Sequence, residues 1–143
     1  MKKPAPPEQE AFVAVQRAAA RLMEGVAELL KPHGLRPAQY NVLRILRGAH
    51  PEQLNCRQVA ARMMTREPDL TRLLDRLEKA GLVLRQRLAS DRRVVRIGIT
   101  PAGLELLARI DAPMLELHHL QFSVLGERQT ATLTRLARRL HES

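Results

Sequence analysis

A charged tip, a short β-branched strand and a helix start follow one another between Asp91 and Gly103. Residues 94–99 read Val-Val-Arg-Ile-Gly-Ile, which is typical of a strand, and Thr100 followed by Pro101 matches a helix N-cap and first helical position. Residues 82–88, just upstream, are a second strand candidate of similar length. The pattern predicts a β-hairpin with an arginine-bearing tip, which is either suited to lying along a phosphate backbone or an ordinary solvated hairpin.

Positive charge is concentrated around this hairpin. The chain has 24 Lys and Arg against 15 Asp and Glu, a formal charge of +9. Residues 55–103 contain 11 basic and 5 acidic side chains, so 11 − 5 = +6 of that charge falls in about a third of the chain. Such a balance indicates a polyanionic partner, either nucleic acid or an anionic membrane surface.

Other features exclude several classes of protein. No apolar run approaches the roughly 20 residues needed to span a bilayer, and the proline-rich, polar N-terminus is unlike a signal peptide, so no membrane partner is expected. Cys56 is the only cysteine, which argues against a disulfide framework or a cysteine-based zinc site. The five histidines show no metal-ligand spacing. We expect a cytoplasmic protein with no metal and no cofactor.

The rest of the chain is predicted to be helical, in a single domain. Apolar periodicity and breaker residues predict a disordered lead over residues 1–7 and helices over residues 8–31, 37–47, 55–64, 65–80, 101–122 and 127–141. Asn55 with Gln58 resembles a capping box, Thr65 is placed to cap the next helix, and Pro113 is expected to bend the fifth. The inward residues of the third helix are expected to be Val59, Ala60 and Met63. Helix, helix, short helix, basic helix, hairpin, helix is the order of a winged helix-turn-helix, mainly α with a small β-wing.

The basic helix over residues 65–80 is the candidate to lie in a major groove. Its leucines at positions 70, 73, 74 and 77 have the spacing of one buried face, so its charged residues point away from the core. We expect Asp69, Thr71 and Arg72 near base edges, and Arg66 and Arg76 nearer phosphates. The alternative is a solvated face with intrahelical ion pairs, such as Asp75 with Lys79.

Three motifs together resemble the MarR family of bacterial transcriptional regulators: residues 70–83 (LTRLLDRLEKAGLV), 90–93 (SDRR) and 99–103 (ITPAG). The match is dense over about residues 37–107. The resemblance implies that Asp91 and Arg93 form the wing's Asp-x-Arg, which holds an arginine for the minor groove, with Arg92 beside them. A carboxylate two residues from an arginine can fix its orientation, and a narrow minor groove attracts the guanidinium.

The resemblance also implies an obligate homodimer, built from helices in residues 8–36 and 101–143 around a DNA-binding region in residues 37–100. The apolar stripes of the terminal helices support this, because they exceed what one small wing domain needs to cover itself. The alternative is a monomer whose terminal helices pack within the chain. The resemblance further implies a small-molecule effector, whose identity and binding residues the sequence leaves open.

We therefore expect a sequence-specific double-stranded DNA-binding regulator, a repressor that an effector releases from a pseudo-palindromic operator. An enzyme is disfavoured, because the chain has no glycine-rich phosphate loop, no nucleophile elbow and no paired carboxylates in an apolar setting. Aromatic residues are only 2%, which argues against single-stranded or RNA targets. Two alternatives stay open: a sequence-independent architectural DNA-binding protein, and a thiol-based redox regulator through Cys56, although a lone cysteine is more often inert packing.

Overall fold

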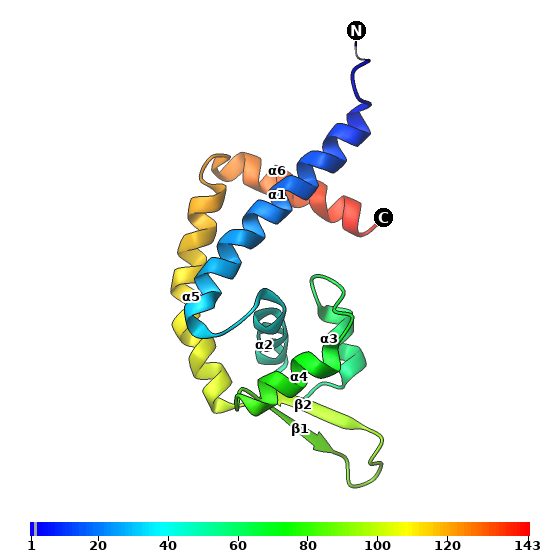
Figure 1. The fold of residues 1–143 in the computed structure, drawn as a ribbon, viewed down its shortest axis with the longest axis vertical. Helices are drawn as coiled ribbons and strands as arrows, with labels where there is room; N and C mark the ends of the chain where they lie inside the picture. Colours follow the sequence, from blue (N-terminus) through cyan, green and yellow to red (C-terminus); the bar gives the residue numbers. More distant parts are fainter. Residues whose placement is uncertain (2) are drawn as a thin grey trace.

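The computed structural model describes Met1 and residues 3–143. Its helices are α1 (Pro7–Leu30), the 3-10 helix η1 (Lys31–His33), α2 (Pro37–Ala49), α3 (Cys56–Arg62), α4 (Leu70–Lys79), α5 (Pro101–Phe122) and α6 (Gly126–His141). Strands β1 (Val83–Arg87) and β2 (Val95–Ile99) form an antiparallel hairpin, the wing (Figure 1). The expected class, mainly α with a small β-wing, is confirmed. Of the predicted lead, residues 3–6 have no regular structure, Pro7 already belongs to α1, and Lys2 lies outside the described residues.

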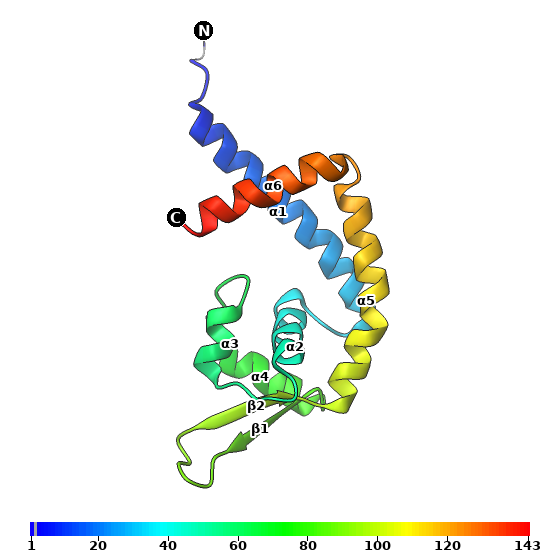
Figure 2. The same cartoon turned by 180° about the vertical axis from the view of Figure 1, so that it is seen from behind.

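The molecule has a winged-helix end and a helical end. At one end, α2, α3 and α4 surround the start of the wing, and at the other α6 crosses over from the far end of α5 (Figures 1 and 2). Helices α1 and α5 pack against each other and against α2, which joins the two ends. The core lies mostly at the winged-helix end, and its fully buried side chains include Leu30, Leu43, Leu46, Leu74, Leu77, Ile97, Leu107 and Ile110.

Helix α4 begins later than the sequence pattern indicated. The four leucines with helical spacing are all buried, as expected, but the N-cap is Asp69 and not Thr65. The Asp69 carboxylate accepts a hydrogen bond of 3.2 Å from the Arg72 N–H, which satisfies one of the free donors in the first turn. Pro68 disfavours a helical conformation at Glu67, so residues 65–68 stay outside the helix.

Helix α3 has the expected start but a different end. The capping box is present: Asn55 N–H donates to Gln58 Oε1 at 2.9 Å, and Gln58 N–H donates to Asn55 Oδ1 at 2.8 Å. The helix ends at Arg62, and Ala60 is exposed, which contradicts the inward position expected for it. One cause of the early helix end is the buried Asn41 of α2. Its Oδ1 accepts a 2.8 Å hydrogen bond from the Met64 N–H, so Met64 lies in the loop after the helix.

Two smaller differences concern helix ends and strand partners. Helix α2 continues through Gly48 to Ala49, two residues beyond the expected end. The wing pairs Val83 with Ile99, and β2 also forms a bridge to Leu54 through two backbone hydrogen bonds of 2.7 and 2.9 Å with Ile97. This bridge ties the loop between α2 and α3 to the wing, and nothing in the sequence pattern indicated it.

Helix α5 starts as expected and is anchored to the wing. The Thr100 hydroxyl accepts from the Gly103 N–H at 3.1 Å and donates to the Gly81 carbonyl at 2.6 Å. The helix then continues unbroken through Pro113 to Phe122. Its first turn packs so tightly on the wing that a Cβ at Gly103 would lie 2.5 Å from the Leu82 carbonyl oxygen.

Replacing Gly103 by alanine should lower the free energy of unfolding by about 1–3 kcal/mol, because the added methyl meets backbone and forces the helix away from the wing. Gly48→Ala is the matched control, since a Cβ there would lie more than 4 Å from every heavy atom outside its own stretch of helix backbone. That change removes a helical glycine and should raise stability by up to about 1 kcal/mol. Urea unfolding followed by circular dichroism, at equal protein concentrations, measures both. Equal effects of the two substitutions would contradict the tight packing at Gly103.

Candidate DNA-binding surface

The polar face of α4 is exposed along its whole length. The exposed side chains on and just before this helix are Arg66, Asp69, Thr71, Arg72, Asp75, Arg76 and Lys79. Arg66 lies in the loop that precedes α4 and not on the helix, which corrects the expectation that the helix begins near Thr65. The other predicted reading residues are brought together on one side of α4, away from the buried leucines.

Asp69 is tied to Arg72 in two ways. Besides capping the helix, its carboxylate lies 3.2 Å from the Arg72 Nε, in an exposed i, i+3 ion pair. The pair uses Nε and leaves the two terminal nitrogens of the guanidinium to contact another group. Asp69 therefore orients the Arg72 side chain, which is 73% exposed, in addition to any contact of its own.

A surface pocket lies where the N-terminus of α2 meets α4. Its polar lining is Arg36, Gln39, Glu67, Asp69, Arg72 and Arg76. Arg36 is the residue just before α2, and its backbone N–H donates to Gln39 Oε1 at 2.9 Å. Three guanidinium groups therefore line one pocket beside α4. Sequence reasoning missed Arg36, although its position next to Pro37, at a helix start, was a signal that its side chain lies at an exposed helix end.

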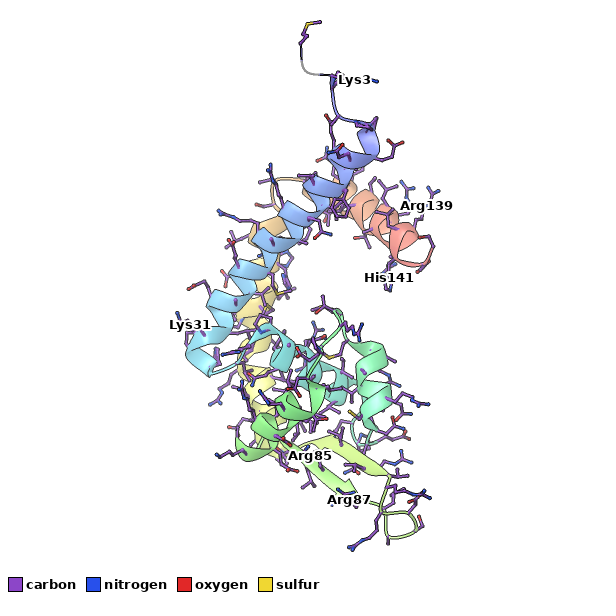
Figure 3. The ribbon with its side chains drawn as sticks, turned by 45° about the vertical axis from the view of Figure 1, so that its right-hand side comes forward. Lys3, Lys31, Arg85, Arg87, Arg139 and His141 are labelled. Carbon is purple, nitrogen blue, oxygen red and sulfur yellow. The ribbon has the colours of Figure 1, made fainter. Side chains whose placement is uncertain are left out.

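The three predicted wing residues meet at the tip of the hairpin. The Asp91 carboxylate accepts from the Arg93 N–H at 3.0 Å and from the Arg93 Nε at 3.3 Å. The Arg93 side chain itself is 93% exposed. Arg87, near the tip in Figure 3, donates from Nη1 to the Arg92 carbonyl at 2.7 Å. The wing thus presents a solvent-facing guanidinium on a backbone that two side chains hold in shape.

Arg85 differs from the other basic residues of this region. Its guanidinium donates to Glu78 Oε1 at 3.0 Å and to Asp75, both on α4, and its side chain is only 23% exposed. Figure 3 shows Arg85 where the wing meets α4. The hydrogen bond from Arg85 holds the pKa of the Glu78 carboxyl below its usual value. Asp75 therefore pairs with the wing and not with Lys79, which corrects the intrahelical pair considered from the sequence.

Arg47 and Asp111 join α2 to α5. The guanidinium and carboxylate meet through two hydrogen bonds, of 2.8 and 3.0 Å, between residues 64 positions apart in sequence. Such a two-point contact has a fixed geometry. This ion pair therefore connects α2, at the winged-helix end, to α5, the helix that leads to α6.

The helical end leaves large apolar side chains uncovered. No residue of α6, which the structure describes completely, is buried. The exposed apolar residues of α1 and α6 include Phe12, Val15, Leu133, Leu136 and Leu140. An apolar stripe of this kind on a helix is usually an interface. The alternative in which the terminal helices cover each other within one chain is not seen for α6.

Cys56 is exposed at the first position of α3, so it is not the packed cysteine that the simplest interpretation would place there. None of the helices, across the residues that the structure describes, is long and apolar enough to cross a bilayer.

Comparison with known proteins gives one family. The sequence model of the MarR family matches residues 35–95. The HTH-type transcriptional regulator PrsX of Escherichia coli is 31% identical over 66% of this chain, and the match spans 57% of PrsX. The crystal structure of a MarR transcription factor from Planctomyces limnophilus is 36% identical, covers 99% of this chain and 98% of its own, and has a TM-score of 0.74.

The fold also recurs in Sco3205, a MarR family transcriptional regulator from Streptomyces coelicolor solved in complex with DNA. It is 23% identical, covers 99% of this chain and 91% of its own, and has a TM-score of 0.86, a likeness that concerns the fold. PrsX is named as a transcriptional regulator and the Planctomyces limnophilus protein as a transcription factor. This chain, with its winged helix-turn-helix and its flanking helices, belongs to the MarR family of transcriptional regulators.

Proposed function

We propose that this protein binds double-stranded DNA sequence-specifically as a cytoplasmic homodimer and regulates transcription, as a repressor that a small molecule releases. The observation that carries the proposal is the pairing of the exposed face of α4 with the arginine-bearing wing. The two elements pack against each other, and both lie at the end of the molecule away from α6 (Figure 2). A helix and a wing so placed suit a major groove and the adjoining minor groove.

The roles of the reading residues follow from their geometry. Thr71 and Arg72 lie in the first turn of α4, the part of a recognition helix that usually meets base edges, with Asp69 as the cap that orients Arg72. We assign Arg66 and Arg76 to phosphates, together with Arg92, and Arg93 to the minor groove with Asp91 as its support. Arg36 joins this set as a phosphate contact, because it shares the pocket with Arg72 and Arg76.

The dimer forms, in this proposal, through residues 8–36 and 101–143, and residues 37–100 read DNA. The uncovered apolar side chains of α1 and α6 support it, since a second copy would bury them. A symmetric dimer presents two copies of α4 and therefore calls for a pseudo-palindrome, with half-sites about one helical turn or 10 bp apart.

In this proposal the effector releases DNA by changing the distance between the two copies of α4. The Arg47–Asp111 ion pair supports such a mechanism, because it links α2 of the reading region to α5 of the proposed dimer region. A ligand that favours one arrangement of these two helices over another would shift the spacing and so the affinity for DNA. The nature of that ligand is open.

Selection of duplexes from a random library by the purified protein tests the proposal. We expect an enriched pseudo-palindrome whose half-sites are centred about 10 bp apart. Recovery of the library without enrichment, despite tight binding, would favour the architectural alternative instead.

Arg36→Ala should weaken binding to the selected and to random duplexes by a similar factor, because a phosphate contact carries no sequence information. It should also reduce the slope of log affinity against log salt by about one unit for each protomer. Arg139→Ala is the control, since this exposed arginine lies on α6, far from the wing (Figure 3). Titrations at several salt concentrations measure the slope, and an unchanged slope for Arg36→Ala would remove Arg36 from the DNA contact.

A further inference from the structure

Glu78 and Asp75 of α4 hold Arg85 of β1 at three points. Glu78 Oε1 accepts from the Arg85 Nη2 at 3.0 Å, and Glu78 Oε2 accepts from the Arg85 backbone N–H at 3.1 Å. Asp75, one turn earlier on the same helix, accepts from the same Nη2. A single residue of the wing is therefore fixed to α4 through both its backbone and its side chain.

The backbone contact satisfies a hydrogen-bond donor on the outer edge of β1, the Arg85 N–H. Arg85 faces Ile97 in the hairpin, and Ile97 directs its own backbone hydrogen bonds away from β1, to Leu54. The Arg85 N–H accordingly points outward, where an edge strand would leave it to solvent. Glu78 accepts a hydrogen bond from that N–H instead, so α4 satisfies this backbone donor at the outer edge of β1.

This cluster works against simple attraction to DNA. One arginine and two carboxylates sum to −1, next to the candidate DNA-binding face of α4. Two carboxylates beside a DNA-reading helix weaken its attraction for phosphates, so the basic surface alone gives no reason for them. A geometric role accounts for them, because both oxygens of Glu78 are in use and their positions are specific.

We propose that Arg85, held by Glu78 and Asp75, is a positioning residue that fixes the wing relative to α4, so that Arg93 and Arg72 engage DNA as one rigid unit. The inference rests on the proposed function and deepens it by naming a determinant of specificity that does not itself touch DNA. A rigid wing loses little conformational entropy when its arginine binds, whereas a loose wing must be ordered first.

Glu78→Gln tests the proposal, because charge and geometry predict opposite effects. The amide keeps the size of the side chain but offers one acceptor oxygen where two are needed. Removal of a negative charge alone should tighten binding to every duplex. The loss of positioning should instead weaken binding to the library-selected duplex about fivefold or more, while binding to a random-sequence duplex stays equal or becomes tighter.

The decisive readout is the effect of Arg93→Ala in two backgrounds. In the wild-type dimer this substitution should lower affinity for the selected duplex about tenfold or more, and in Glu78→Gln about threefold or less, because the loose wing already contributes little. Arg85→Met should reduce the effect of Arg93→Ala in the same way, although its loss of a positive charge weakens binding to every duplex. Circular dichroism shows whether each variant is folded. Glu105→Gln, which removes an exposed carboxylate on α5, is the matched control and should leave the effect of Arg93→Ala unchanged.

An equal effect of Arg93→Ala in both backgrounds would overturn the positioning role, as would tighter binding of Glu78→Gln to both duplexes alike. These failures are distinct from failure of the proposed function. If the wild-type protein itself fails to distinguish the selected from the random duplex, sequence-specific reading is wrong, and the role of Arg85 falls with it.

Discussion

Leu136→Asp should convert the proposed dimer into a monomer and lower affinity for the palindromic duplex by about a hundredfold or more. Leu136 lies on the uncovered apolar stripe of α6, and an aspartate there would be buried without a partner in the dimer interface. Two linked protomers bind two half-sites far more tightly than one protomer binds one, so a monomer loses the contribution of the second copy of α4.

Sedimentation at micromolar concentration and DNA titration measure the two effects together. Arg138→Asp is the control, because it places the same carboxylate on the opposite side of α6. A Leu136→Asp protein that stays dimeric, or a monomer with unchanged affinity, would contradict the assignment of α6 to the dimer interface.

Arg72→Ala and Arg93→Ala should weaken DNA binding in different ways. Loss of Arg72 should relax discrimination at one base position in each half-site, at a cost of about 1–3 kcal/mol for each base contact. Loss of Arg93 should leave that discrimination in place and reduce the preference for a narrow, A·T-rich minor groove beside it. The physical basis is position: Arg72 is in the first turn of α4, whereas Arg93 is at the wing tip.

Competition with duplexes that carry single base-pair changes separates the two effects. If both variants lose affinity for every duplex by the same factor, the assignment of Arg72 to base reading is wrong and Arg72 contacts phosphate.

Local patterns in the sequence predicted the parts of this fold that depend on local physics. The four leucines of α4 identified its buried face, because helical spacing alone decides which side of a helix is apolar. Thr100 and Pro101 identified the start of α5, since capping needs only neighbouring residues. The Asp91–Arg93 contact was implied by the resemblance to the MarR family, and its partners are only two residues apart.

Features that depend on distant residues were missed. The bridge between Leu54 and Ile97 and the contacts of Arg85 with Glu78 arise only once the loop and the wing are folded against α2 and α4. The start of α4 was misplaced because two residues, Thr65 and Asp69, could each cap a helix there. The choice between them depends on Pro68 and on the hydrogen bond from the Met64 N–H to Asn41 Oδ1, which fixes the preceding loop.

The count of basic residues overstated the free positive charge on α4 and the wing. Arg85 is bound to two carboxylates, and Arg72 and Arg93 each have an acidic partner two or three residues earlier in the chain. Among residues 3–143, no ion pair joins Arg66, Arg76 or Arg92 to a carboxylate, so these three proposed contacts are available to phosphates. The positive charge that the candidate site offers to DNA therefore depends on which arginines have acidic partners as well as on the number of arginines.

The ratio of affinities for the selected duplex and for a scrambled duplex of equal length, at physiological salt, tests the central claim most directly. Sequence-specific reading by two copies of α4 and the wing predicts a ratio of about a thousandfold or more. A ratio near one, with binding that salt weakens equally for both duplexes, would show that the basic surface contacts only the DNA backbone and would contradict the account.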